Sequence, residues 1–125
     1  MKLLLDSHAV VWWAVFPGRL RSVTRAAISS PDNEVFLSAA TVWELGLKIA
    51  RGKLKLPEDY APRLLANGFE ELPVSITHAA RAMMLPPLHS DPFDRLLIAQ
   101  ALDEGLLLVT SDRSVMRYDV PTMEA

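Results

Sequence analysis

The segment from His89 to Asp112 constrains the fold of this chain more than any other part of the sequence. Asp91 followed by Pro92 is typical of a helix start, because Asp caps free backbone N–H groups and Pro fits the first helical position. Residues 93–102 are apolar on almost every side, which indicates a helix covered by the rest of the protein. Gly105 predicts the end of that helix, since glycine tolerates the left-handed conformation found there.

Two short apolar runs predict strands that are buried on both faces. Leu106–Val109 has no polar alternation, which is typical of a parallel sheet, and Asp112 lies just beyond it. Lys2–Leu5 is similar and is followed directly by Asp6. Ligands of open α/β sheets bind outside the carboxyl ends of the strands. If the two strands are parallel, both acids are therefore expected at the same edge of the sheet.

The rest of the chain continues an alternation of helices and strands. Helices are expected over Ser7–Phe16, Arg19–Ser30, Ser38–Arg51, a segment that starts at Leu56–Asp59 and ends at Asn67-Gly68, and Ser75–Leu85; further strands are expected over Glu34–Leu37 and Leu72–Val74. Pro73 places the last of these strands at an edge. The alternation predicts an α/β fold with a mostly parallel central sheet.

Length and composition indicate one domain over residues 1–125. The chain is 50% hydrophobic and 22% charged, which predicts a real core and argues against disorder. No apolar run approaches the ~20 residues needed to cross a bilayer, and the first residues resemble no signal peptide. The absence of cysteine excludes disulfides and thiolate metal sites and fits a cytoplasmic protein. No membrane partner is expected.

Four acids follow a predicted strand or lie early in the helix after one: Asp6, Glu44, Asp94 and Asp112. Each has a structural alternative. Asp94 also suits the positive end of a helix dipole, and Glu44 would complete a capping box if Thr41 were the cap. Ser38, directly after a strand, is the better cap and puts Glu44 in the second helical turn. Their common placement at one end of a sheet favours a shared site over four separate caps.

A cluster of carboxylates needs a counter-charge. Two carboxylates at ~4 Å repel by ~4 kcal/mol at an effective dielectric near 20, and a divalent cation removes this cost. Oxygen ligands suit Mg²⁺ or Mn²⁺, and zinc is disfavoured without cysteine or convergent histidines. Such a metal activates water and stabilises charge on a phosphoryl oxygen. His8 and His78 are expected to be structural rather than ligands.

Basic and aromatic side chains accompany the acids in the first half of the chain. Lys48 and Arg51 share a helix face with Glu44, and Lys53 and Lys55 extend the positive charge. This run is either a solvated helix face or a ridge that contacts RNA, and the sequence leaves both open. The adjacent tryptophans, at positions 12 and 13, favour packing or a subunit interface over base stacking.

The motifs LLLDSHAVVWW, SAATVWELGLKIARGKL, HSDPFDRLLIAQAL and LLVTSD resemble the PIN-domain nucleases and, within them, the VapC toxins of bacterial type II toxin–antitoxin pairs. The resemblance implies a PIN-like three-layer α/β/α domain. It also implies an Mg²⁺- or Mn²⁺-dependent endoribonuclease that hydrolyses RNA phosphodiesters by metal-activated water. A cognate antitoxin that also binds operator DNA would restrain it. The expected assemblies are a toxin homodimer and a toxin–antitoxin hetero-oligomer.

The family's acids map onto Asp6, Glu44, Asp94 and Asp112, all of which are present. The resemblance implies that they are catalytic and that Asp6, Asp94 and Asp112 hold the metal, while Glu44 positions or deprotonates the attacking water. Asp91 remains a helix cap. The neighbours of Asp112 at positions 110 and 111, Thr110 and Ser111, are candidates to assist it or to bind phosphate. An antitoxin arginine entering the acidic pocket is a plausible inhibitory device.

Two other classes of function remain for comparison. A PIN-like module that binds RNA or antitoxin without cutting predicts a missing acid, and none is missing. A phosphoryl-acceptor domain of receiver type needs paired acids after an early strand and a lysine after a late one, and Ser111-Asp112-Arg113 offers no such lysine. A nuclease assay with Mg²⁺ and an EDTA control separates the hydrolase from both.

Overall fold

The computed structural model describes all 125 residues of the chain. The elements in chain order are β1 (Lys2–Leu5), α1 (Ser7–Val15), the 3₁₀ turn η1 (Pro17–Arg19), α2 (Ser22–Ser29), β2 (Glu34–Ser38), α3 (Ala39–Ala50), α4 (Tyr60–Ala66), β3 (Glu70–Leu72), α5 (Ile76–Met84), α6 (Pro92–Glu104), β4 (Leu107–Thr110), α7 (Arg113–Met116) and β5 (Thr122–Glu124). Helices and strands alternate along most of the chain, as the sequence predicts.

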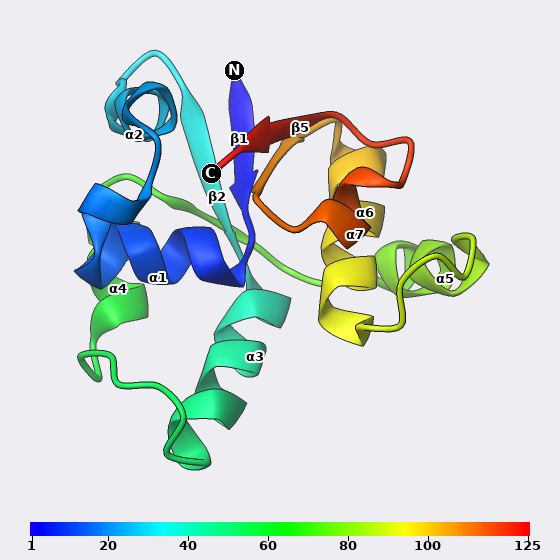
Figure 1. Cartoon of the computed structure of the whole chain (residues 1–125), viewed down its shortest axis with the longest axis horizontal. Coiled ribbons are helices and arrows are strands. Elements are labelled where there is room, and N and C mark those ends of the chain that lie inside the picture. The colour runs from blue at the N-terminus through cyan, green and yellow to red at the C-terminus, as the bar shows by residue number, and fades with distance from the viewer.

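The five strands form one sheet in the order β3-β2-β1-β4-β5, and every neighbouring pair is parallel. Helices α1, α2 and α4 cover one side of the sheet, and α5, α6 and α7 cover the other (Figure 1). The predicted α/β class with a parallel central sheet and helices on both faces is therefore confirmed. Because β1 and β4 are neighbours, the residues that follow them leave the sheet at the same edge.

The core lies on both faces of the sheet because side chains alternate along each strand. Leu3 and Leu5 of β1 pack with Val10 and Leu20 on the side of α1 and α2. Leu4, from the same strand, packs on the opposite side with the residues of α6 and β4. All three leucines of β1 are fully buried, which explains why this strand shows no polar alternation.

The helix starts that carry the acids have the predicted caps. The Asp91 carboxylate accepts hydrogen bonds from the N–H groups of Phe93 (2.9 Å) and Asp94 (3.0 Å), and Gly105 ends α6 with a φ of 66°. Ser38 caps α3 by accepting from the Ala40 N–H at 3.1 Å. Glu44 consequently lies in the second turn of α3, and its alternative role in a capping box is wrong.

Three predicted boundaries are wrong. The helix expected from Arg19 begins only at Ser22, because Leu20 is extended and buried between η1 and α2. The helix expected from residues 56–59 begins at Tyr60, after a turn in which the Tyr60 N–H bonds the Pro57 carbonyl. The strand expected at residues 72–74 is β3, which begins two residues earlier, at Glu70, and ends at Leu72. It ends before Pro73, which has no backbone N–H to donate to a neighbouring strand. Its edge position is confirmed.

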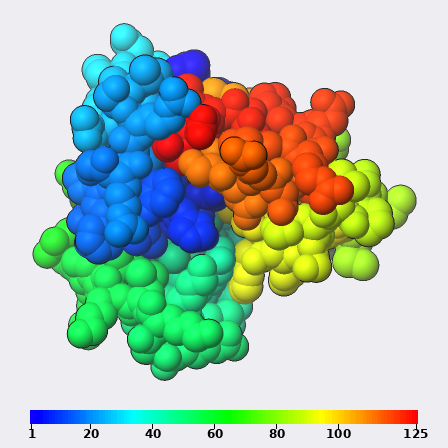
Figure 2. Space-filling view, viewed as in Figure 1, coloured from blue at the N-terminus to red at the C-terminus, as the bar shows by residue number.

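The C-terminal segment adds two elements that the sequence analysis did not predict, α7 and β5. The strand β5 pairs with β4 and closes the sheet, and its Glu124 forms an ion pair with Arg21 at 2.7 Å. In the space-filling view, the red C-terminal segment lies directly against the blue N-terminal helices (Figure 2). None of the helices has the length and apolar character required of a membrane span.

Candidate functional site: an acidic cluster at the carboxyl edge of the sheet

The four predicted acids come from four different elements that meet at one end of the sheet. Asp6 follows β1 and caps α1, and Asp112 follows β4 and caps α7. Asp94 lies in the first turn of α6 and Glu44 in the second turn of α3. We call these four residues the acidic cluster. Their mutual electrostatic effects, described below, place each of them close to at least one other member.

Asp6 is almost completely buried, with 3% of its surface exposed. One carboxylate oxygen accepts a hydrogen bond from the Ala9 N–H at 2.9 Å. Burial raises the pKa of Asp6, hydrogen bonds from Thr110 and Ala9 oppose the rise, and the negative charge of Asp112 adds to it. The Thr110 hydroxyl also accepts from the Asp112 N–H at 3.0 Å. Thr110 therefore lies between the two acids, and its expected role in assisting Asp112 or binding phosphate stays a prediction.

The Asp94 carboxyl group also lies in surroundings that disfavour its charged form. Burial raises its pKa to about 6, and the negative charges of Asp91, Asp6 and Glu44 add to the rise. A hydrogen bond with His89 opposes it. The same surroundings that raise the pKa of Asp94 make its charged form costly, and a cation bound beside it would offset that cost.

Glu44 presents an unpaired acceptor inside the protein. Its residue surface is 7% exposed, and Oε2 forms an ion pair with Lys48 Nζ at 3.2 Å. Oε1 is buried and has no hydrogen-bond partner. Such an orphaned acceptor costs roughly 1–3 kcal/mol unless some group satisfies it. A bound cation or a water held by one would do so.

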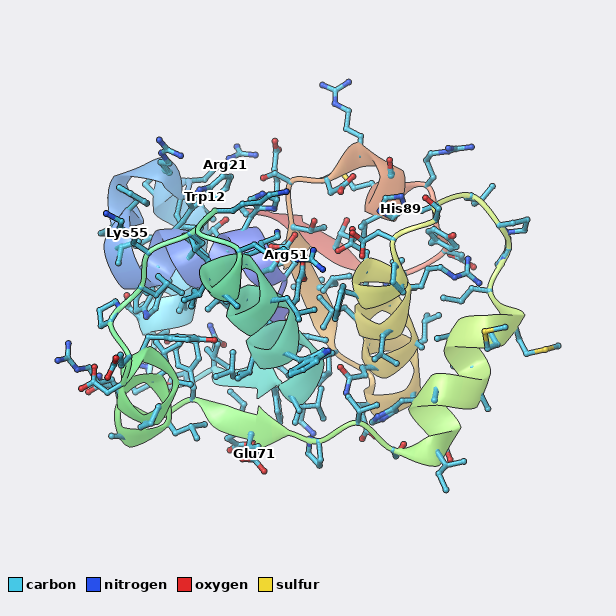
Figure 3. The ribbon with its side chains drawn as sticks, turned by 90° about the horizontal axis from the view of Figure 1, so that it is seen from below. Trp12, Arg21, Arg51, Lys55, Glu71 and His89 are labelled. Atoms are coloured by element: carbon cyan, nitrogen blue, oxygen red, sulfur yellow. The ribbon has the colours of Figure 1, made fainter.

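His89 joins the acidic cluster, and the sequence analysis missed it. Its Nε2 lies 2.8 Å from Asp94 Oδ2 and 4.0 Å from Asp112 Oδ2. One ligand atom from each of His89, Asp94 and Asp112 lies within 4.8 Å of the others, so these residues could hold a metal ion. Figure 3 shows His89 on the α6 side of this end of the molecule. Its only sequence signal is its position in the loop just before the Asp91 cap.

Other candidate residues lie apart from the acidic cluster or serve the fold. The Ser111 hydroxyl donates to the Ala125 carbonyl at 3.4 Å, so its hydrogen bond leads away from the acids. His8 is exposed, with its ring centroid 6.0 Å from that of Trp12. His78 is buried and completes the capping box of α5, in agreement with a structural role.

A groove beside the acidic cluster combines basic and aromatic side chains. We call it the basic groove; it is lined by Ser7, His8, Val11, Trp12, Phe16, Arg19, Leu45, Lys48, Lys53 and Leu54. Its lining contains no acid, and Ser7 directly follows Asp6. Of the predicted basic run, Lys48 and Lys53 line this groove, whereas Arg51 and Lys55 do not. Trp12 and Lys55 lie on the α1 side of this end of the molecule, away from His89 (Figure 3).

The donor set of the acidic cluster fits a divalent cation. Carboxylate oxygens are the ligands that Mg²⁺ and Mn²⁺ prefer, and the orphaned Glu44 Oε1 is an acceptor without a donor. Burial is the main cause of the raised pKa values of both Asp6 and Asp94, and neighbouring carboxylates add to each rise. Chemically, such a site can bind a phosphate group through a shared cation.

Comparison with known proteins agrees with this geometry. The profile of the PIN domain matches residues 3–121. The chain is 33% identical to Ribonuclease VapC22 of Mycobacterium tuberculosis over 122 residues, which cover 95% of this chain and 93% of that protein.

Solved structures share the fold at lower sequence identity. The structure of VapBC2 from Rickettsia felis, bound to a DNA fragment from its promoter, matches with a TM-score of 0.74 and 17% identity. The match covers 98% of this chain and 98% of that one. A toxin–antitoxin complex from Klebsiella pneumoniae matches with a TM-score of 0.65 and 19% identity, covering 98% of this chain and 96% of that one. At these identities the likeness concerns the fold alone.

Proposed function

This chain belongs to the PIN-domain family, and on that premise we propose that it is an endoribonuclease that hydrolyses RNA phosphodiesters with the help of Mg²⁺ or Mn²⁺. The observation that carries the proposal is the acidic cluster: four acids from separate elements meet at the carboxyl edge of the sheet, and one has an orphaned buried oxygen. The relative with 33% identity is a ribonuclease by name, which supports RNA as the substrate.

The acids would divide the work of binding and proton transfer. Asp6 and Asp94 would hold the cation, and Asp112 would complete its binding site from the end of β4. When bound, the cation supplies charge neutralisation at the phosphoryl oxygens and makes water a stronger acid. Thr110 would keep Asp6 and Asp112 in register through its hydrogen bonds to both.

Glu44 would position the attacking water. Lys48 occupies Oε2, so Oε1 is the oxygen that is free to accept a hydrogen bond from water and then its proton. The water oxygen would then bond to phosphorus while the bond from phosphorus to the 3′ oxygen breaks on the opposite side, and the departing 3′ oxygen would take up a proton. The products would be a 5′-phosphate and a 3′-hydroxyl.

The basic groove offers a path for the RNA on one side of the scissile phosphate. Arg19, Lys48 and Lys53 supply positive charge for the phosphate backbone, and Trp12 and Phe16 supply surfaces on which bases stack. Single-stranded RNA is recognised by this combination of stacking and charge. The groove begins next to Asp6, so a strand lying in it would reach the acidic cluster.

We also propose that the protein is the toxin of a type II toxin–antitoxin pair, a homodimer held inactive by a cognate antitoxin. The toxin–antitoxin complex that shares this fold supports the assignment. Large apolar side chains are exposed on α3 and α5, and they are suited to protein contacts: Trp43, Ile76, Met83 and Met84.

A cleavage assay tests the enzymatic part of the proposal. Purified protein should cut single-stranded RNA with Mg²⁺ or Mn²⁺, stop in EDTA, and leave 5′-phosphate ends. Asp94→Asn should abolish cutting while the circular dichroism spectrum stays unchanged. Cleavage by pure Asp94→Asn protein, or in EDTA, would refute the proposed chemistry. RNA binding without cutting by the wild-type protein would instead indicate a silent binding module.

A further inference from the structure

Hydrogen bonds to the backbone of His89 fix the loop that carries it. Its backbone N–H donates to the Tyr118 hydroxyl at 3.0 Å, and its carbonyl accepts from Arg95 Nη1 at 3.4 Å. The Arg95 guanidinium also donates to the carbonyls of Ala82 (2.8 Å) and Leu85 (3.1 Å), which ties the loop between α5 and α6 to the start of α6. The imidazole is therefore presented to the acidic cluster by an anchored loop.

The distances from His89 match those between ligands of one octahedral ion. With bonds of about 2.1 Å, ligands on neighbouring corners lie about 3.0 Å apart and ligands on opposite corners about 4.2 Å apart. His89 Nε2 lies 2.8 Å from Asp94 Oδ2 and 4.0 Å from Asp112 Oδ2. One ligand atom from each of the three side chains lies within 4.8 Å of the others, so a single ion could contact all three once the side chains move closer together.

The geometry points to His89 Nε2 as a nitrogen ligand of the cation, beside Asp94 and Asp112, that gives the site a preference for Mn²⁺ over Mg²⁺. This inference rests on the proposed function only in that a divalent cation binds the acidic cluster. Imidazole suits first-row transition metals, whereas Mg²⁺ favours oxygen ligands and water. The sequence patterns indicate oxygen ligands alone, because none of them places a histidine at this edge of the sheet.

A simpler role for His89 makes the opposite prediction. As a hydrogen-bond donor to Asp94, the ring would only balance a buried carboxylate, and an arriving cation would displace it. As a ligand, Nε2 must present its lone pair, so the neutral ring would carry its proton on Nδ1. The two roles differ in whether a nitrogen nucleus contacts the bound ion.

Electron spin echo spectroscopy of the full-length protein with Mn²⁺ alone distinguishes the two roles. The wild-type protein should show coupling of the manganese electron spin to a directly bound ¹⁴N nucleus. The coupling should vanish in His89→Gln and persist in His8→Gln, which removes an exposed histidine two residues after Asp6. Absence of the coupling in the wild-type protein, or its persistence in His89→Gln, would overturn the assignment. The wild-type measurement alone can refute it, so the test does not depend on the folding of a variant.

Calorimetric titration with each metal measures the preference. His89→Gln should weaken Mn²⁺ binding by about 10-fold or more, the scale on which groups around metal sites act, and should change Mg²⁺ binding by less than about threefold. Equal weakening for both ions would overturn the preference. Tyr118→Phe removes the hydroxyl that holds His89, Leu88, Arg95 and Pro86 and leaves the imidazole in place, so its Mn²⁺ affinity should lie between those of the wild-type protein and His89→Gln.

The outcome is separable from that of the proposed nuclease. Metal-dependent RNA cleavage without nitrogen coupling would overturn the His89 assignment and leave the nuclease intact. Nitrogen-coupled Mn²⁺ binding without cleavage of any RNA would overturn the nuclease and leave the assignment intact.

Discussion

Two buried polar clusters in this protein each pair a histidine with a carboxylate, and they are built in opposite ways. In the first, His78 Nε2 lies 2.9 Å from Glu104, and His78 Nδ1 accepts from the Ser75 N–H at 3.0 Å. Gln100 and Ser38 extend this cluster through a side-chain hydrogen bond of 2.6 Å. We call it the His78 cluster. None of its side-chain polar atoms is buried without a partner.

The second is the acidic cluster with His89. Its histidine bond is as short, at 2.8 Å, but Glu44 Oε1 is left without a partner and burial raises the pKa values of Asp6 and Asp94. Satisfied buried polar groups stabilise a fold, whereas unsatisfied ones cost free energy. The difference teaches that a histidine–carboxylate bond alone says little about function. A binding site is indicated instead by the buried acceptor without a partner and by the raised pKa values of the neighbouring carboxyl groups.

Neutralising one member of the acidic cluster should give the largest effect. Asp6→Asn should lower the rate of RNA cleavage by at least about a hundredfold, because a ligand charge is lost at the reacting phosphate. The amide oxygen can still accept from the Ala9 N–H, so the cap of α1 and the fold should survive. The matched control is Glu104→Gln in the His78 cluster, which should leave the rate unchanged. Equal losses in both variants would erase the distinction between the clusters.

Removing the histidine of the other cluster should affect stability instead. His78→Ala should lower the free energy of unfolding by roughly 2–4 kcal/mol, because it empties a buried site and leaves the Ser75 N–H without its partner. Urea denaturation measures the loss, and His8→Ala, at an exposed histidine, should be close to neutral. Cleavage per folded molecule should not change in His78→Ala. A specific loss of activity at full stability would contradict the structural role.

The acidic cluster should destabilise the metal-free protein as pH rises. The pKa of Asp94 is about 6 in the folded protein and 3.8 as a model value, so between these values the folded state binds more protons than the unfolded state. The stability present below about pH 4 should be lost as pH rises through 6, by at most about 3 kcal/mol. Asp94→Asn should remove the contribution of Asp94 to this pH dependence, leaving that of Asp6, and should raise the melting temperature in EDTA at pH 7.5.

Adding Mn²⁺ provides the control for that measurement. The cation should raise the melting temperature of the wild-type protein at pH 7.5 and leave that of Asp94→Asn nearly unchanged. The stability difference between the wild-type protein and Asp94→Asn should therefore change between pH 4.5 and pH 7.5 in EDTA. If this difference is the same at both pH values, the pKa of Asp94 is not raised in the folded protein.

Local sequence patterns were sufficient for the parts of the site that depend on one strand or one helix start. Asp6 and Asp112 follow apolar runs, and the Asp91-Pro92 pair marks the start of α6 with Asp94 in its first turn. These signals depend on residues adjacent in the chain. The parallel pairing of β1 with β4 then brings the acids to the same edge.

Features that depend on distant contacts were missed. His89 reaches Asp94 because Tyr118, 29 residues away, holds its backbone. The strand β5 spans only three residues and exists through its pairing with β4, so propensity gives little sign of it. The distinction between the two clusters is equally nonlocal, since it depends on which buried atoms find partners.

The smallest predicted effect concerns the boundary between the acidic cluster and the basic groove. Lys53 lines the groove and Lys55, two residues on, does not, so the pair forms a matched test of where RNA lies. Lys53→Ala should raise the KM for single-stranded RNA by about three- to tenfold with kcat unchanged, and should reduce the salt dependence of binding by about 0.7 in the log–log slope, as expected for one lost phosphate contact. Lys55→Ala should change neither quantity. Both residues are exposed lysines on one loop, so equal effects would mean that RNA is attracted by the general positive charge of this loop. The basic groove would then not be the path by which RNA reaches the acidic cluster.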